Sequence, residues 1–322
     1  MNYPSFLGIV AILFLLMATG FFLRKIGIMR EEDSKRLSTL VLKVCQPFMI
    51  ISALASAEFS YENLTSGLII CAFGLFVHGV MSLLAFFLCK GFKDFDERKI
   101  TEFSLIFTNT GFIGFPIMQS LFPENGLFLA AFYLISFHLV VWSWGLAILA
   151  RGHSDIKLTV KKVLFNFGSI PCFIGLALYL LGIPFAGFAL PEFLIKFMDY
   201  LGNVCTPLST LITGAALATC SVKQLFGQPK VYLTAFLKLI VMPLSVCVIC
   251  KGVCLLLGLD PMSVAMICTV EAALPSAATV TMFCEMYGMR SIYASLTVGT
   301  SALFSAATLP LVLLLAEWIL TL

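Results

Sequence analysis

The sequence predicts an all-α integral membrane protein whose ten transmembrane helices form two inverted five-helix repeats. Three observations predict this fold: the hydropathy, the charges of the loops and a repeated proline pattern. The chain has 322 residues, of which 60% are hydrophobic and only 11% charged, and its mean hydropathy is +1.04. Soluble domains carry about 25% charged residues, so the composition excludes a soluble fold.

Ten apolar segments are long enough to cross a bilayer, whose hydrocarbon core of about 30 Å needs about 20 helical residues. The second, fourth, seventh and ninth segments also carry polar residues and prolines. The first is interpreted as a membrane helix, because no basic region precedes its apolar run as in a signal peptide. The expected spans are 5–23, 37–57, 65–89, 100–121, 126–150, 164–183, 193–219, 231–258, 261–285 and 291–320.

The connections between these spans alternate in charge. Loops after odd-numbered spans hold most of the 20 Lys and Arg residues, whereas the charged residues of the other loops are acidic. Because basic loops favour the cytoplasmic side, both termini are predicted to lie outside the cytoplasm. The alternation also supports the count of ten spans, since a miscounted span would destroy it.

A duplicated proline pattern divides the chain into 1–162 and 163–322. The second span contains Val-Cys-x-Pro ending at Pro47, and the seventh contains it again, ending at Pro207. Pro116 follows Pro47 by 69 positions, and Pro275 follows Pro207 by 68. Five spans are an odd number, so the second copy enters the membrane from the opposite side. Inverted repeats of this kind recur in secondary transporters.

The fourth and ninth spans are expected to be broken. They contain "TNTGFIGFPIM" (108–118) and "VEAALPSAATV" (270–280), in which proline removes a helix hydrogen bond. Unpaired backbone groups are costly in lipid unless protein or a wet cavity surrounds them. We therefore predict breaks near 109–116 and 271–276 that cross at the midplane. Their free N–H and C=O groups would bind a ligand, and half-helix N-termini favour anions.

These two motifs resemble those of the auxin efflux carrier family. Its fourth span carries Asn-Thr-x-x-x-Gly-x-Pro, its ninth carries Ala-Ala-Leu-Pro, and "LKLIVMPLSV" (237–246) resembles its Lys-containing eighth span. The resemblance implies the fold of bile-acid:sodium symporters and sodium/proton antiporters. In that fold spans 1, 2, 6 and 7 form a scaffold, and spans 3–5 and 8–10 form a mobile transport unit. It also implies homodimers that meet through the scaffold and an elevator stroke.

The resemblance further implies a small organic anion as substrate. Plant members export auxin, and bacterial members are assigned to carboxylates such as malate or malonate. This chain lacks the long loop between the fifth and sixth spans of many plant members, and it has Glu271 where they typically have Gln. It is therefore identified as a bacterial-type member of the inner membrane that needs no cofactor or metal.

The candidate residues fall into two groups. Substrate binding is assigned to the broken spans, where the Asn109 amide can donate to a carboxylate; the residues are Thr108, Asn109, Thr110, Gly111, Pro116, Glu271, Pro275 and Ser276. The scaffold-side candidates are Gln46, Pro47, Thr206 and Pro207.

Three ionisable residues are candidates for ion coupling or charge compensation. Lys238 precedes Pro275 by 37 positions and His78 precedes Pro116 by 38, so they occupy equivalent places in the two repeats. Glu271 lies deep in the ninth span, where an ionisable group is functional by default. For Glu271 the alternatives are an ion pair with Lys238, in which the lysine takes the place of a bound cation, and a permanently protonated acid. The sequence leaves H⁺ coupling, Na⁺ coupling and uncoupled transport open.

Three other ionisable residues have structural interpretations. His138 is expected to be a hydrogen-bonded core histidine, with a proton relay as the alternative. The Lys43 side chain is expected to extend to the membrane surface, and Glu102 is expected at the surface near a helix start.

Other function classes have less support. A cation/proton antiporter of the same fold would use aspartates at the crossover, which has none, and a channel would need a pore-lining repeat. A membrane enzyme would need clustered ligands, but the chain has three His, and only His153, near Asp155, has an acid close by in sequence. No basic face indicates nucleic-acid binding. The sequence thus predicts a transporter, not an enzyme, whose partners are the bilayer and an organic anion.

Overall fold

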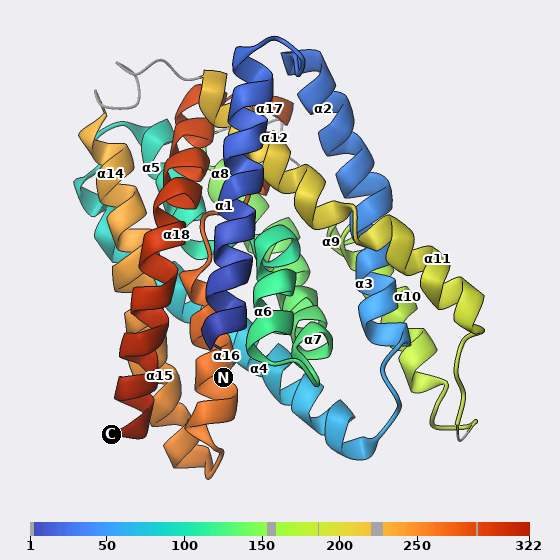
Figure 1. The fold of residues 1–322 in the computed structure, drawn as a ribbon. Helices are drawn as coiled ribbons and strands as arrows, with labels where there is room; N and C mark the ends of the chain where they lie inside the picture. Colours follow the sequence, from blue (N-terminus) through green and yellow to red (C-terminus); the bar gives the residue numbers. More distant parts are fainter. Residues whose placement is uncertain (1–2, 153–158, 186, 220–227, 288) are drawn as a thin grey trace. The chain divides into compact units, whose positions relative to one another are not determined.

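The computed structural model describes residues 3–152, 159–185, 187–219, 228–287 and 289–322, and these residues are helical apart from turns and one isolated β-bridge (Figure 1). They divide into two compact units. Unit 1 comprises Met1–Ala72, Gly111–Leu139 and Thr159–Ala215, and unit 2 comprises Phe73–Thr110, Val140–Leu158 and Ala216–Leu322. His153 and Asp155 lie outside the described residues.

Unit 1 holds the N-terminal helices and most of the middle of the chain. Helix α4 runs through both units, as do α12 and the π-helical turn η3. The elements are α1 (Tyr3–Lys25), α2 (Glu31–Leu40), η1 (Val41–Cys45), α3 (Gln46–Ala55), α4 (Tyr61–Leu88), η3 (Thr110–Gly114), α6 (Phe115–Leu121), α7 (Gly126–Val140), α9 (Val160–Leu164), α10 (Ser169–Leu180), α11 (Glu192–Gly202) and α12 (Cys205–Thr219).

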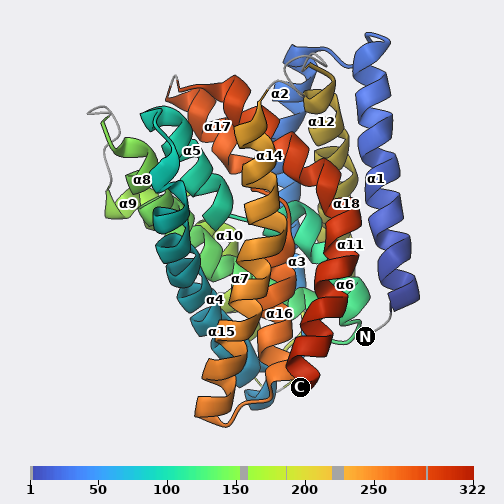
Figure 2. The same cartoon turned by 90° about the vertical axis from the view of Figure 1, so that its left-hand side faces the viewer.

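Unit 2 holds the C-terminal helices, of which α15, α16 and α18 pack side by side (Figure 2). Its elements besides the end of α4 are η2 (Cys89–Gly91), α5 (Phe95–Ile106), η4 (Val141–Gly145), α8 (Leu146–Ala150), α14 (Pro229–Phe236), η5 (Leu237–Val241), α15 (Met242–Leu257), α16 (Pro261–Ala273), α17 (Thr279–Met286) and α18 (Ser291–Thr321).

The helices agree with an integral membrane protein. Among the described residues, 7 continuous helical stretches are long and apolar enough to cross a membrane. The other three expected spans correspond to the shorter α10 and to two interrupted pairs, α5 with α6 and α16 with α17. The all-helical fold is thus confirmed, while the count of ten spans and the inverted repeat stay predictions.

The two Val-Cys-x-Pro segments meet inside unit 1. Cys45 and Cys205 are buried in one hydrophobic cluster with Val41. Close approach of the surrounding helices depends on Gly202, where an added Cβ would lie 2.9 Å from Met49 Cα. The sequence repeat therefore marks two segments that pack against a shared core.

Helices α1 and α12 approach each other through reciprocal glycines in unit 1. A Cβ added to Gly20 of α1 would lie 2.0 Å from the Leu211 carbonyl oxygen of α12. A Cβ added to Gly214 of α12 would lie 1.9 Å from the Met17 carbonyl oxygen of α1. Small residues permit such backbone contact between membrane helices, so this crossing tolerates no side chain at either position.

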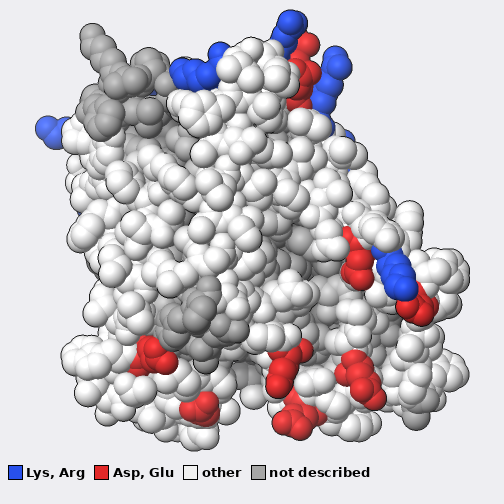
Figure 3. Space-filling view, in the orientation of Figure 1, with Lys and Arg blue, Asp and Glu red and all other residues white. Residues whose placement is uncertain are grey.

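Charged side chains of unit 1 gather at the ends of its helices. Lys and Arg side chains lie over the turn between α1 and α2, at the top of the view in Figure 3. The turn contains Arg24, Lys25 and Arg30 and is followed by acidic residues in the first turn of α2. Acidic side chains lie at the lower edge of the view (Figure 3).

Glu102 corrects one expectation, because it is buried rather than at the surface. Its helix begins at Phe95, one turn earlier than expected, and Glu102 is only 1% exposed. Two arginines hold its carboxylate: Arg98 Nε lies 2.9 Å from Oε1, and Arg151 Nη1 lies 2.5 Å from Oε2. A buried charge persists only when it is paired in this way. Glu102 therefore links α5 to the chain that follows α8.

The Glu102→Gln variant is expected to unfold more easily by about 2 kcal/mol, because it weakens two charge-assisted hydrogen bonds. The measurement is the thermal unfolding of purified protein in detergent. The matched control is Glu31→Gln, which removes another i,i+4 pair: Glu31 lies 3.0 Å from Lys35, but both side chains are exposed. An exposed pair contributes about 0.5 kcal/mol. Equal effects of the two substitutions would contradict the structural role of Glu102.

Candidate functional site

Two chain segments of unit 2 leave the helix and pair with each other. Helix α5 ends at Ile106 and α16 ends at Ala273. Between them, Thr108 and Ser276 form an isolated antiparallel β-bridge. The Asn109 N–H donates to the Pro275 carbonyl at 2.8 Å, and the Ala277 N–H donates to the Phe107 carbonyl at 2.9 Å. We call Phe107–Asn109 with 274–278 the paired breaks; the prediction that both spans are interrupted is confirmed.

Pro116 plays a different part from the one expected. The first break lies at Phe107–Asn109, whereas Pro116 is the second residue of α6. The chain between them forms the π-helical turn η3. Pro47 and Pro243 likewise follow η1 and η5 directly. A proline ring clashes with the preceding turn, and in all three places a widened turn accommodates it, so the helix continues.

The end of α5 leaves carbonyl groups without helical partners, and side chains from elsewhere in unit 2 satisfy them. The Ser276 hydroxyl donates to the Ser104 carbonyl at 3.0 Å, and Lys238 Nζ donates to the Leu105 carbonyl at 3.0 Å. The Ser276 N–H donates to the Ser301 hydroxyl at 3.1 Å. A helix C-terminus carries negative partial charge and favours a cation. Lys238 therefore places an amine donor at the paired breaks.

The expected ion pair between Lys238 and Glu271 is wrong. Lys238 is 0% exposed, and its ammonium group binds the main-chain carbonyl of Leu105. Neither carboxyl oxygen of Glu271 has a hydrogen-bond partner among the described residues. The physical reason is that the end of α5 offers Lys238 a stationary acceptor within reach of η5. Lys238 thus binds the C-terminal end of α5 and not the Glu271 carboxyl group.

Glu271 is buried in the last turn of α16. It is 0% exposed, and the Thr110 hydroxyl lies close enough to interact with its carboxyl group. That hydroxyl is instead 2.9 Å from the Thr108 hydroxyl, with which it shares a hydrogen bond. Glu271 thus has the Thr110 hydroxyl as a polar neighbour, but neither of its oxygens makes a hydrogen bond of standard geometry to a described residue.

His78 and Asn109 also lie at the paired breaks. The His78 ring lies 5.8 Å from the Phe107 ring, and its Nδ1 lies 2.6 Å from the Gly74 carbonyl oxygen. Asn109 is 5% exposed, and within the described ranges its side-chain amide makes no hydrogen bond. Unit 2 therefore brings together most of the residues predicted for substrate and ion: His78, Thr108, Asn109, Thr110, Lys238, Glu271, Pro275 and Ser276.

The remaining candidates belong to unit 1. The Gln46 amide packs directly on Gly111, where an added Cβ would lie 2.7 Å from Nε2. Pro47 lies in the first turn of α3, and Thr206 and Pro207 lie in the first turn of α12. The Gln46 contact connects the motif of the second span with the glycine of the fourth.

His138 corrects another expectation. It is 5% exposed, but neither ring nitrogen has a hydrogen-bond partner among the described residues. The ring packs on Gly168, where a Cβ would lie 2.0 Å from its Cε1. The N–H groups there are already taken, because Gly168 and Ser169 donate to Asn166 Oδ1. Lys43, as expected, is exposed, and its ammonium lies 5.1 Å from the Phe167 ring centroid.

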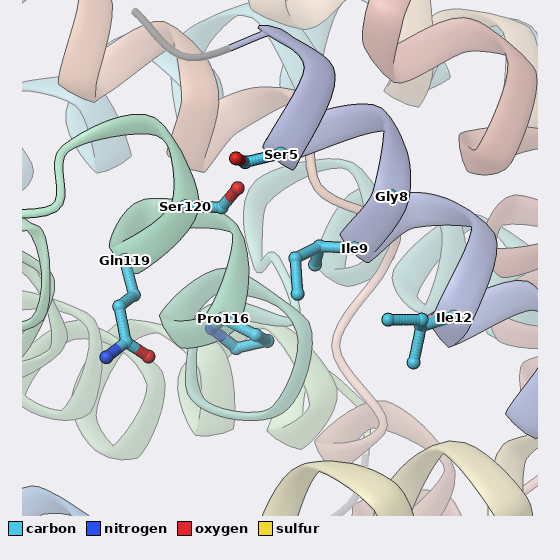
Figure 4. Close-up of a pocket in the computed structure, with 7 residues that line it drawn as sticks. All are labelled: Ser5, Gly8, Ile9, Ile12, Pro116, Gln119 and Ser120. Atoms are coloured by element: carbon cyan, nitrogen blue, oxygen red, sulfur yellow. The ribbon is translucent and has the colours of Figure 1, made fainter.

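A cavity of about 320 Å³ lies between α1 and α6 in unit 1 (Figure 4). Ile9, Ile12 and Pro116 form its apolar wall, and Ser5, Gln119 and Ser120 supply the polar groups. Its lining contains no charged side chain to balance an anion. The paired breaks, with a buried ammonium group, are the stronger candidate site.

Sequence reasoning missed several groups at the paired breaks. The Ser104 and Leu105 carbonyls at the end of α5 accept hydrogen bonds from Ser276 and Lys238. The Ser301 hydroxyl of α18 accepts from the Ser276 N–H. Thr279 and Thr300 have buried hydroxyl groups without partners in the part of the chain described. Carbonyl groups carry no residue-specific signal, but the polar "TS" at 300–301 inside an apolar span was a visible one.

Comparisons with known proteins agree with this architecture. The family model described as "Membrane transport protein" matches residues 5–313. An uncharacterized transporter of Methanocaldococcus jannaschii is 27% identical over 245 residues, which are 74% of this chain and 76% of that protein. An uncharacterized transporter of Methanothermobacter thermautotrophicus is 24% identical over 300 residues, 92% of this chain and 93% of that protein. The chain therefore belongs to the auxin efflux carrier family of integral membrane transporters.

Proposed function

We propose that this transporter carries small organic anions, such as malate, malonate or auxin-like acids, and binds them at the paired breaks of unit 2. One observation carries the proposal: buried polar groups with unused hydrogen-bonding capacity are concentrated there. Native proteins satisfy nearly all buried polar atoms, so each exception needs an explanation such as a ligand or water. The exceptions in unit 2 are Ser104 Oγ, both Glu271 oxygens, Thr279 Oγ1 and Thr300 Oγ1.

The charge at the paired breaks favours an anion. Lys238 is buried and donates to a carbonyl at the end of α5, so one of its three N–H groups is used in that bond. Asn109 adds two amide donors that no described residue occupies. A carboxylate accepts hydrogen bonds from such donors, and bonds to charged groups are about twice as strong as neutral ones. The chemistry therefore suits a small carboxylate.

Lys238 also bears on the coupling ion. A cation at the end of α5 would compensate the partial charge that the ammonium group already compensates. We infer that transport proceeds without sodium. For the movement itself we propose the elevator stroke of a homodimer that the family resemblance implies, with spans 1, 2, 6 and 7 as the scaffold.

The test is counterflow in proteoliposomes that contain purified protein. Radiolabelled malonate, malate and indole-3-acetate are offered in turn, with sodium or choline as the only cation besides protons. Exchange of at least one carboxylate at equal rates in both salts supports the proposal. Absence of counterflow for every carboxylate overturns the anion assignment, and a strict need for sodium overturns the role of Lys238.

The Asn109→Ala variant is expected to lower counterflow at least about tenfold, because a hydrogen bond to a charged group contributes about 1.5–3 kcal/mol. Its thermal stability should stay close to that of the unaltered protein, since the side chain bonds no described residue. Asn125→Ala is the matched control, because Asn125 is exposed in the loop before α7. Unchanged counterflow in Asn109→Ala would remove Asn109 from the site, and a large loss of stability would make it structural.

A further inference from the structure

We propose that Glu271 carries a proton together with the transported anion, so that a proton gradient drives transport. This inference rests on the proposed function, because it assigns the coupling ion of the same site. The geometry points to Glu271: its carboxyl group is fully buried, it lies beside the paired breaks, and neither oxygen has a partner among the described residues.

The burial of Glu271 favours its neutral form in this conformation. An ionised carboxylate without a partner costs several kcal/mol inside a protein, and a group in that position neutralises instead. Main-chain N–H groups offer no relief, because Glu271 lies within α16 and that helix ends two residues later at Ala273. The acid therefore carries its proton here, and ionisation requires water or a cation to reach it.

The groups on the surrounding elements do not alter this conclusion. Helix α16 packs against α15, α18 and η5. From η5 comes Lys238, whose ammonium binds the Leu105 carbonyl. Helix α15 offers buried thiols and Lys251, which donates to the Ile319 carbonyl at 2.8 Å. The titratable or charged groups on these elements and on α16 itself are Lys238, Cys247, Cys250, Lys251, Cys254, Cys268, Tyr293 and Glu317.

The titratable residues of α18, Tyr293 and Glu317, lie near the two ends of that helix. The Tyr293 hydroxyl lies 3.0 Å from the Thr101 hydroxyl, with which it shares a hydrogen bond. Glu317 lies near the C-terminal end of the helix. Facing the paired breaks, α18 presents Ser301, whose hydroxyl accepts from the Ser276 N–H and does not titrate. These groups include no second carboxyl group at the paired breaks that could take the proton in place of Glu271. A further titratable side chain at the paired breaks is His78 of α4, whose Nδ1 lies 2.6 Å from the Gly74 carbonyl oxygen.

Proton and anion movement are linked by charge. A protonated Glu271 can donate its O–H to a substrate carboxylate, whereas an ionised Glu271 would repel it. When the site opens to water, the carboxylic acid ionises to a carboxylate, and the proton passes to water. The repulsion then favours release of the anion, so proton and anion leave on the same side. One proton accompanies each anion in this scheme.

The experiment compares the unaltered protein with Glu271→Gln in proteoliposomes, with radiolabelled malonate and malate as probes. A gradient of one pH unit, acid on the side of the labelled anion, supports about tenfold accumulation when one proton is coupled. The unaltered protein should reach such accumulation, and a pH dye inside the vesicles should report proton entry with the anion. Glu271→Gln should lose both signals, because an amide cannot release a proton, and any counterflow that the variant retains should not depend on pH.

Glu124→Gln is the matched control, since Glu124 is an exposed carboxyl group in the loop before α7. It should retain both accumulation and the dye signal. Accumulation by Glu271→Gln equal to that of the unaltered protein overturns the inference, as does accumulation driven by sodium alone. Counterflow by a folded Glu271→Gln that keeps the pH dependence of the unaltered protein also overturns it. Absence of counterflow in the unaltered protein instead refutes the anion function itself.

Discussion

Lys238→Ala lowers the stability of the protein by about 4 kcal/mol. The substitution leaves the Leu105 carbonyl without its donor in a buried place, which costs about 1–3 kcal/mol. It also empties the space of a fully buried side chain, and cavities from large-to-alanine changes cost about 2–5 kcal/mol. Thermal unfolding in detergent measures the total. Transport should fall in parallel, because the paired breaks lose the donor that holds the end of α5.

Two further variants separate these contributions. Lys238→Met keeps most of the volume and removes the donor, so its effect should equal the hydrogen-bond part alone. Lys251→Met is the matched control: Lys251 also donates to a helix-terminal carbonyl, that of Ile319, but it is only partly buried. Its loss should cost less than about 1 kcal/mol. If both methionine variants are equally stable, the hydrogen bond to Leu105 contributes no more to stability than the hydrogen bond to Ile319.

Because Lys238 and Glu271 form no ion pair, substitutions at the two positions should act independently. In the double variant Lys238→Met with Glu271→Gln, the effects of the two changes should add to within about 0.5 kcal/mol. A double variant more stable than Lys238→Met alone by several kcal/mol would restore the ion pair, because removing one member of a buried pair strands the other charge.

Gly214→Leu is expected to prevent correct folding of unit 1, or to destabilise it by more than about 4 kcal/mol, the range of severe packing errors. Any Cβ at this position would lie 1.9 Å from the Met17 carbonyl oxygen, and a main-chain atom cannot move aside alone. Helices α1 and α12 would have to separate along their whole crossing. The measurements are the yield of monodisperse protein in gel filtration and the thermal unfolding temperature.

Gly252→Leu is the control for that substitution. Gly252 lies within α15, and a Cβ there meets no atom within 4 Å. Leucine is also the better helix former by about 0.8 kcal/mol, so this variant should be as stable as the unaltered protein. A folded, stable Gly214→Leu would show that α1 and α12 do not depend on backbone contact.

Much of the candidate site could be predicted from the sequence, since a break needs polar and helix-breaking residues. "TNTG" and "LPSA" mark the two interruptions to within a few residues. Pro116 was misread for a physical reason. The π-helical turn before Pro116 removes the clash between its ring and the preceding turn, so the helix continues. A proline in the sequence is therefore compatible both with an interrupted helix and with a helix that continues after a π-helical turn.

The sequence by itself determined the apolar spans, the transporter family and the existence of both interruptions, because hydropathy and helix breaking depend on neighbouring residues. Only the tertiary structure decided the partners of the buried charges. Lys238 could have met Glu271, but it met the carbonyl of Leu105, and Glu102 met two arginines inside the protein. Every residue carries the same main-chain carbonyl group, so residue types do not reveal which one a fold leaves free at a helix end. That choice left Glu271 buried without a partner, and it makes Glu271 the group to test for proton coupling.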